Sequence, residues 1–164
     1  MSPRPFLRWP DPRLRTPAAP VGAVTDAHRA IWDEMLEAMY AMPGVGLAAP
    51  QIGVMLRLAV VDADDGAGPV RLADPVIVAA SGQTRRHVEA SPNLPGVSAP
   101  VDRPRAVTVA YADETGRRRE GEFVLLRATS VQHQIDHLDG RMYFDRLSRT
   151  RRDMLLRKAA KRGA

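Results

Sequence analysis

Residues 132–140 read Gln-His-Gln-Ile-Asp-His-Leu-Asp-Gly, and we expect the rest of the fold to be arranged around this segment. His133 and His137 stand four residues apart, so on a helix they share one face and can reach a single metal ion. Gly140 stands where such a helix would end, and Thr129 and Ser130 lie on the same side one turn earlier. The stretch therefore predicts a helix that presents two imidazoles and two hydroxyls together.

The residue between the two histidines is a neutral amide, Gln134. A metal hydrolase of the His-Glu-x-x-His type has a carboxylate there, which accepts a proton from the attacking water. An amide cannot act as a base at any ordinary pH. The pair alone has two interpretations, a metal site or two helix histidines satisfied by hydrogen bonds, and the rest of the chain has to decide between them.

Length and composition are those of an ordinary globular protein. The chain has 164 residues, 45% of them hydrophobic and 26% charged, which is enough to bury a sizeable core. No apolar run is long enough to span a membrane, and residues 1–5 lack the apolar core of a signal peptide. The absence of cysteine excludes disulfides and thiolate metal ligands. We therefore expect one domain over residues 1–164, located in the cytoplasm without membrane contact.

The positive charge is concentrated near the C-terminal end. The whole chain has a formal net charge of +5, and residues 149–162 hold seven Lys or Arg residues against one acid, Asp153. Taking this +6 from the total of +5 leaves −1 for all other residues, so the basic character belongs to the C-terminal segment.

The N-terminal part predicts an extended arm followed by one helix. Residues 1–20 are punctuated by prolines and should lie as an arm on the body. Thr25 is a suitable helix cap, and Ile31, Met35 and Met39 follow at helical spacing as a core-facing stripe.

Residues 44–53 form a tight turn rich in glycine and alanine. No Lys-Ser/Thr pair follows, and the spacing matches no dinucleotide fingerprint, so this is not a phosphate-binding loop. Small residues suggest that the backbone presses closely against another element, with Gln51 as the one polar side chain presented.

The remaining pattern is typical of an α+β fold. The expected strands cover residues 56–62, 70–79, 84–90, 106–112 and 122–126, the last two forming a hairpin. A last helix should cover residues 147–162, opened by a capping-box-like pattern at Thr150. We expect mostly antiparallel sheets wrapped around the central helix that carries His133 and His137, with a basic C-terminal helix.

Three stretches, in this order along the chain, resemble the motifs of the peptide deformylase family. Residues 44–51 match Gly-x-Gly-Leu-Ala-Ala-x-Gln, residues 89–96 occupy the place of Glu-Gly-Cys-Leu-Ser, and residues 133–138 resemble His-Glu-x-x-His-Leu. Residues 11–15 and the basic last helix are also similar, so the resemblance covers essentially the whole chain. It implies the deformylase fold and metal-dependent removal of the formyl group from the N-terminal methionine of new bacterial proteins.

The metal site that the resemblance implies is altered in this chain. In the family two histidines, here His133 and His137, and one cysteine hold a divalent ion such as Zn, Fe or Ni. Ser91 stands in place of the cysteine, and its neutral hydroxyl binds divalent metals poorly. We therefore expect the metal to be weakly held or absent.

The groups that act on the substrate are altered as well. Gln134 replaces the general base, whose contribution is typically about 10²–10⁴-fold in rate. In the family, Gln51 and the backbone N–H after the cysteine hold the developing oxyanion together. Pro92 has no N–H, and one such donor is commonly worth about 10²–10³-fold.

Substrate-contacting positions are implied by the resemblance alone. They are Val45, Gly46, Leu94, Thr129 and Ser130. The family usually has an apolar wall for the methionine side chain where this chain has Thr129 and Ser130. A polar wall binds methionine less well, so we expect a different ligand.

Three further residues belong to the surroundings of the site. Arg103 and Asp136 occupy positions that form a pair behind the metal in the family, and the alternative is that they only tie helix to strand. Strand alternation puts His87 on the same face as Glu89, where it could replace the missing ligand. We favour a surface histidine beside Arg85 and Arg86 instead.

Three functional hypotheses follow. The first is a deformylase-fold protein that has lost ordinary deformylase activity and binds a peptide or small acylated ligand. The second is a weakly active metal-dependent deformylase. The third is a repurposed acyl hydrolase or transferase with Ser91 as nucleophile and His133 or His137 as base.

The basic helix suggests a partner of its own. In several deformylases a similar C-terminal helix contacts the ribosome, and a polyanion suits residues 149–162. The alternative is a solvated helix whose Met154, Leu155 and Leu156 pack on the body.

Overall fold

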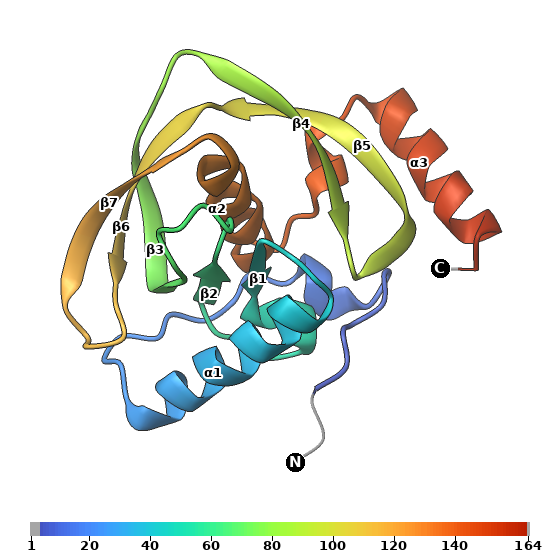
Figure 1. Cartoon of the computed structure of the whole chain (residues 1–164). Coiled ribbons are helices and arrows are strands. Elements are labelled where there is room, and N and C mark those ends of the chain that lie inside the picture. The colour runs from blue at the N-terminus through green and yellow to red at the C-terminus, as the bar shows by residue number, and fades with distance from the viewer. Residues whose placement is uncertain (1–3, 164) are drawn as a thin grey trace.

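The computed structural model describes residues 4–163, so the first three residues of the predicted arm lie outside the described part. Its helices are α1 (Asp26–Ala41), α2 (Leu125–Leu138) and α3 (Arg149–Lys161), with short 3-10 turns at Pro12–Arg15, Ala49–Ile52 and Tyr143–Arg146. Its strands are β1 (Gly46–Ala48), β2 (Leu58–Val61), β3 (Val70–Ala80), β4 (Thr84–Ser91), β5 (Leu94–Pro104), β6 (Ala106–Ala112) and β7 (Arg118–Val124) (Figure 1).

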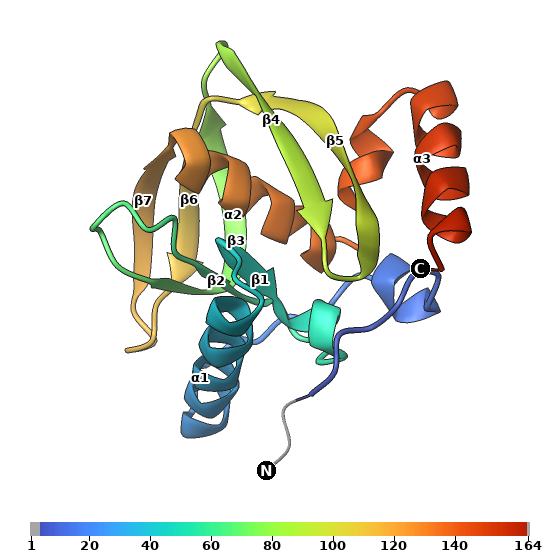
Figure 2. The ribbon, with the colours of Figure 1, turned by 45° about the vertical axis from the view of Figure 1, so that its right-hand side comes forward.

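The strands form two antiparallel sheets around α2. The larger sheet has the order β1-β2-β3-β6-β7, and β4 pairs with β5 in a separate two-stranded sheet. Figures 1 and 2 show α2 running through the space that the two sheets enclose. Residues 128–138 are all buried, as a helix surrounded on every side must be. The α+β fold expected from the sequence is confirmed.

A sharp turn directs the histidine helix into the core. The chain leaves β7 at Val124 and starts α2 at Leu125, whose φ of 54° lies in the left-handed region. The sequence pattern extended this strand to residue 126, which is wrong, because the helix has already begun there. One turn into α2 the apolar side chains Val131, Ile135 and Leu138 pack into the core of the larger sheet.

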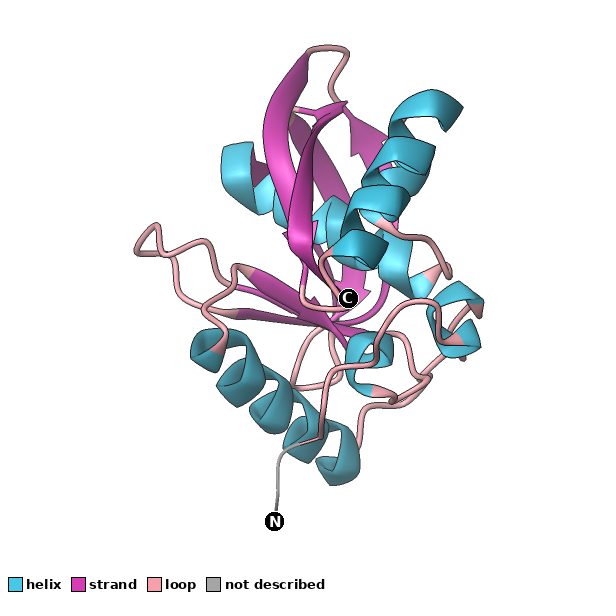
Figure 3. Ribbon diagram, turned by 90° about the vertical axis from the view of Figure 1, so that its right-hand side faces the viewer, coloured by secondary structure: helices cyan, strands magenta, loops and turns pink. Residues whose placement is uncertain are grey.

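The other two helices lie at opposite ends of the molecule (Figure 3). Helix α1 buries Met35 and Met39 with Trp32 against β1 and β2, which confirms the predicted methionine stripe. Helix α3 buries only Leu155 and Ala159, against β5. Its N-cap is Ser148, whose hydroxyl accepts from the backbone N–H of Arg151, so the cap predicted at Thr150 is wrong.

Strand β5 was not expected from the sequence, because Pro95, Pro100 and Pro104 lie within it. Proline cannot donate to a sheet ladder, and it is tolerated here because β5 pairs with β4 alone and leaves its other edge unpaired in that sheet. Strand β1, at residues 46–48, was likewise missed inside the predicted glycine-rich turn.

The N-terminal arm lies on the body as predicted and contacts the motif segments. The N–H of Leu7 donates to the carbonyl of Gln51, and the N–H of Trp9 donates to the carbonyl of Asn93. The arm thereby ties together two loops that are 42 residues apart in the sequence.

Candidate active site

Helix α2 brings His133 and His137 together at one point. Their Nε2 atoms are 3.2 Å apart, and both side chains are buried. This is the arrangement expected for histidines four apart on one helix face. Tyr143 packs against His133 with its ring nearly parallel, at a centroid distance of 6.0 Å, and so holds the imidazole from one side.

A buried carboxylate fixes the orientation of His133. Glu89 Oε1 lies 2.8 Å from His133 Nδ1. Burial alone would raise the pKa of Glu89, but hydrogen bonds from His133 and Arg103 outweigh it and lower this pKa to about 2. Glu89 is therefore an anion at neutral pH and accepts the Nδ1 proton, which leaves the Nε2 lone pair of His133 directed at His137.

Arg103 connects this carboxylate to the helix itself. Its Nε and Nη2 donate to Glu89 at 2.7 and 2.9 Å, and its Nη1 donates to Asp136 at 2.9 Å. Arg146 binds the other side of Asp136, with Nη2–Oδ1 at 2.6 Å. Two guanidinium groups therefore balance two carboxylates in the network behind the histidines.

Burial is the largest cause that lowers the pKa of His137 well below its ordinary value. This imidazole is therefore neutral at physiological pH. Its Nδ1 atom is buried and makes no hydrogen bond within residues 4–163. A neutral imidazole is the form that donates a lone pair to a metal ion.

Ser91 is engaged by Asn93 and not by the histidines. The Ser91 hydroxyl donates to Asn93 Oδ1 at 3.1 Å and accepts from the Asn93 backbone N–H at 3.2 Å. Gln51 Nε2 donates to the same Oδ1 at 2.8 Å, and Gln51 Oε1 accepts from the N–H of Ala48. A closed hydrogen-bond network thus occupies both Ser91 and Gln51.

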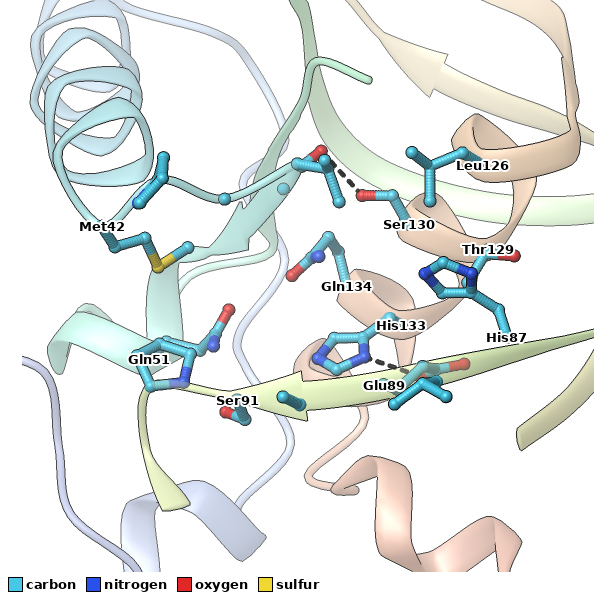
Figure 4. A pocket seen from close by; sticks show the side chains of 17 residues that line it. Met42, Gln51, His87, Glu89, Ser91, Leu126, Thr129, Ser130, His133 and Gln134 are labelled. Carbon is cyan, nitrogen blue, oxygen red and sulfur yellow. Dashed lines mark hydrogen bonds and ion pairs between the residues drawn. The ribbon is translucent and has the colours of Figure 1, made fainter. Parts of the chain in front are cut away.

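One cavity of about 360 Å³ opens in front of these residues (Figure 4). Its walls come from the segment after α1, from β4 and from α2, and His133, Gln134, Ser91 and Gln51 all line it. Gln134 points into the cavity from α2 in Figure 4, and its Oε1 atom is buried with no partner among the described residues. An unsatisfied carbonyl of this kind is available to accept a hydrogen bond from a ligand.

The structure places most of the predicted substrate positions on this cavity. Val45, Gly46, Thr129 and Ser130 line it, with the Ser130 hydroxyl donating to the carbonyl of Val45 at 2.9 Å. A Cβ at Gly46 would collide with Ser130 and Gln134, which is the close backbone approach that the small residues suggested.

Leu94 is the predicted substrate residue that the structure does not bring to the cavity. It is 2% exposed and packs with the arm and with β5 in the cluster that α3 covers. The chain turns at Pro92 and Asn93 before β5 begins, so the side chain of Leu94 faces away from the histidines.

Strand alternation places four polar residues on the inner face of β4. Arg85 and His87 are half-buried there, and Glu89 and Ser91 are fully buried. His87 lines the cavity and is partly exposed there. Sequence reasoning also missed Arg85, whose position the same alternation would have given, and Asn93, whose partners are distant in sequence.

The donors present fit a divalent metal only in part. The two Nε2 atoms converge, and the Glu89 contact to His133 is the kind of support that metal-binding histidines have. The third donor does not fit, because Ser91 offers a neutral hydroxyl held by Asn93. Within residues 4–163, no group of three or more His, Cys, Asp or Glu side chains is arranged to hold a metal ion.

Comparison with known proteins places this fold and site in one class. The family described as polypeptide deformylase matches residues 3–153. The peptide deformylase of Methylocella silvestris is 44% identical, over 96% of this chain and 84% of the relative. A Brucella melitensis protein named peptide deformylase-like is 39% identical over 98% of each chain.

Solved structures agree with this assignment. A peptide deformylase from Legionella pneumophila superposes with a TM-score of 0.90 at 38% identity, covering 98% of this chain and 95% of that one. One from Synechococcus elongatus, solved in complex with actinonin, has a TM-score of 0.90 at 35% identity, covering 98% and 89%. The chain belongs to the peptide deformylase family, whose members are metal-dependent enzymes. Within residues 4–163, no helix is long and apolar enough to cross a membrane.

Proposed function

We propose that this family member binds an N-acylated, peptide-like ligand in the cavity beside α2 and hydrolyses formyl-methionyl peptides at a rate near background. The observation that carries the proposal is the closed network of Ser91, Asn93 and Gln51. The network engages Ser91, which stands in the place of the third metal ligand, and Gln51, whose amide would hold the oxyanion.

The cavity favours binding over proton transfer. Gln134 stands where a base would act, and an amide does not accept a proton at neutral pH. Its unpaired Oε1 instead suits the N–H of an acylated amino group. Pro92 offers no N–H to a developing oxyanion, and Gln51 Nε2 already donates to Asn93.

His133 and His137 would hold a divalent ion if one binds. Such an ion would polarise a carbonyl and lower the pKa of a water molecule. Two imidazoles without a thiolate make a weak site, so we expect the ion to be lost on dialysis against a chelator.

The test measures the hydrolysis of formyl-Met-Ala-Ser by the Ni²⁺-loaded protein. The comparison is a triple variant with Ser91→Cys, Gln134→Glu and Pro92→Leu, loaded in the same way. We expect kcat/KM of the variant to be at least about 10²-fold higher, because the base alone is typically worth that much. Adding Asn93→Ser to the variant tests whether the hydrogen bonds that Asn93 makes to residue 91 and to Gln51 limit the rate. Turnover by the unaltered protein at ordinary enzyme rates would refute the proposal.

A weakly active metal-dependent deformylase is the second candidate. The intact Glu89, Arg103 and His133 arrangement favours it, because these groups still orient the metal-binding nitrogen. The same assay separates the two, since a weak enzyme shows Ni²⁺-dependent turnover that His133→Ala abolishes. A serine nucleophile has less support, because the Ser91 hydroxyl bonds to Asn93 and not to an imidazole.

The basic face of α3 supports contact with a polyanion such as the ribosome as an additional property. Leu155 and Ala159 attach the helix to the body, and Met154 is 60% exposed, so it does not pack on the body as the alternative of a solvated helix required. Most of the basic side chains point outward from this anchored helix. We propose the ribosome as partner, and co-sedimentation with ribosomes tests this contact.

A further inference from the structure

Arg85 lies directly behind Thr129, a residue of the cavity wall, and has no carboxylate partner among the described residues. Its side chain is half-buried on the inner face of β4, and its Nη1 donates to Thr129 Oγ1 at 3.0 Å. Within residues 4–163 this guanidinium forms no ion pair, whereas the neighbouring Arg86 points outward and pairs with Asp102 at 2.9 Å. A half-buried guanidinium without a counter-ion is a ready anion-binding group.

The charges behind the histidines do not neutralise Arg85. Glu89 and Asp136 are the carboxylates of that region, and Arg103 and Arg146 already balance them. Both oxygens of Glu89 are occupied, by Arg103 and by His133. The positive charge of Arg85 is therefore in excess at this end of the cavity.

Two polar side chains, Thr129 and His87, lie near this charge. Thr129 lines the cavity and accepts from Arg85, which keeps its own O–H proton for a second partner. His87 lines the cavity too, and its ring makes no hydrogen bond to another described residue. Figure 4 shows the His87 ring above β4 with Thr129 and Leu126 at the same end of the cavity.

We propose that Arg85, His87 and Thr129 form a subsite for a carboxylate, so that the preferred ligand is an N-acylated peptide whose first side chain is acidic. This inference rests on the proposed function, because it names the ligand class of the same cavity. Inward positions repeat about every 7 Å along a strand, so His87 lies one step and Arg85 two steps from Glu89. Thr129 lies one helical turn before His133, so a side chain that runs past Thr129 from an acyl group near His133 and Gln134 approaches the guanidinium that Thr129 holds.

The test compares three peptides by isothermal titration: formyl-Glu-Ala-Ser, its neutral isostere formyl-Gln-Ala-Ser, and formyl-Met-Ala-Ser. We expect the acidic peptide to bind about 10-fold to 100-fold tighter than the glutamine peptide, as a charge-assisted hydrogen bond in a half-buried site should provide. Arg85→Gln should remove this preference and leave affinity for the glutamine peptide nearly unchanged.

Arg86→Gln is the matched control, because it removes the same charge one residue away on the outer face of β4. The preference should survive in this variant, and circular dichroism checks that both variants fold. Equal affinity of the native protein for the acidic and neutral peptides overturns the inference, as does a preference that Arg85→Gln leaves intact. Binding of none of the peptides overturns it as well.

The outcome is separable from that of the proposed function. Peptides that bind without an acidic preference refute the carboxylate subsite and leave slow hydrolysis standing. Rapid turnover of formyl-Met-Ala-Ser refutes the proposed function, while an Arg85-dependent preference in binding would still support the subsite.

Discussion

The two sides of the histidine pair differ in the kind of polar groups that surround them. On the inner side, Glu89, Arg103 and Asp136 form a buried network that orients His133. On the cavity side, the neutral side chains of Ser91 and Gln134 line the cavity, and Ser91 is bonded to Asn93. Removing one member of the charged inner network leaves a buried charge without its partner, so we expect its loss to be costly, whereas we expect substitutions among the neutral groups of the cavity side to affect stability less. The contributions of the two sides can therefore be measured separately.

The largest effect should come from the inner network. Arg103→Met leaves Glu89 without its guanidinium partner in a site where both side chains are 3% exposed. Removing one partner of a buried ion pair typically costs about 3–5 kcal/mol. Urea unfolding followed by circular dichroism measures the loss.

Arg86→Met is the control for this substitution. It breaks an ion pair whose side chains are 67% and 52% exposed, and such pairs contribute about 1 kcal/mol or less. Equal destabilisation by the two substitutions would mean that the inner network does not carry the stability assigned to it.

The same network should make stability depend on pH in the acid range. The pKa of Glu89 is lowered from 4.5 to about 2 in the folded protein, so its contribution is fully present above about pH 4.5. It is lost as the pH falls from there toward 2, by an amount on the order of 3 kcal/mol. Unfolding free energies measured between pH 6 and pH 2 should therefore fall more steeply for the native protein than for Glu89→Gln. Parallel curves would contradict the assignment.

Metal affinity offers a direct comparison of the two sides. Glu89→Gln should weaken Ni²⁺ binding about 10-fold to 100-fold, because it removes the group that orients His133. Ser91→Ala should leave the affinity nearly unchanged, since its hydroxyl is bonded to Asn93. Isothermal titration measures both, with His133→Ala as the variant that should not bind. A larger loss in Ser91→Ala than in Glu89→Gln would reverse the roles of the two sides.

Local motifs allowed most of the site to be predicted from sequence. His133 and His137 follow from helical spacing, and the inner face of β4 follows from alternation.

Asn93 could not be predicted, because its partners Gln51 and Leu7 are 42 and 86 residues away. Leu94 was placed wrongly because the turn at Pro92 and Asn93 ends the alternation of β4. Strand β5 was missed because prolines are tolerated on a free sheet edge, a property of the assembled sheet that the local pattern does not contain.

The smallest effect on stability, and one confined to binding, should come from the outward face of α3. Arg157, Lys158 and Lys161 are exposed there, while Leu155 and Ala159 hold the helix against β5. A variant that reverses these three charges (Arg157→Glu, Lys158→Glu, Lys161→Glu) should therefore change the unfolding free energy by only about 0.5 kcal/mol per site. If α3 binds a polyanion, the same variant should lose co-sedimentation with ribosomes.

The matched control reverses the charge of three exposed arginines on the β6–β7 hairpin: Arg117→Glu, Arg118→Glu, Arg119→Glu. These substitutions change the net charge by the same amount as those in α3. Binding through α3 should survive in this control and weaken steeply as salt rises, because released counterions dominate such affinities. Equal pelleting of both variants and the native protein would show that the charges of α3 only keep the helix solvated. If both variants lose ribosome binding equally, the attraction depends on net charge alone. Docking through α3 requires that only the substitutions in α3 abolish binding.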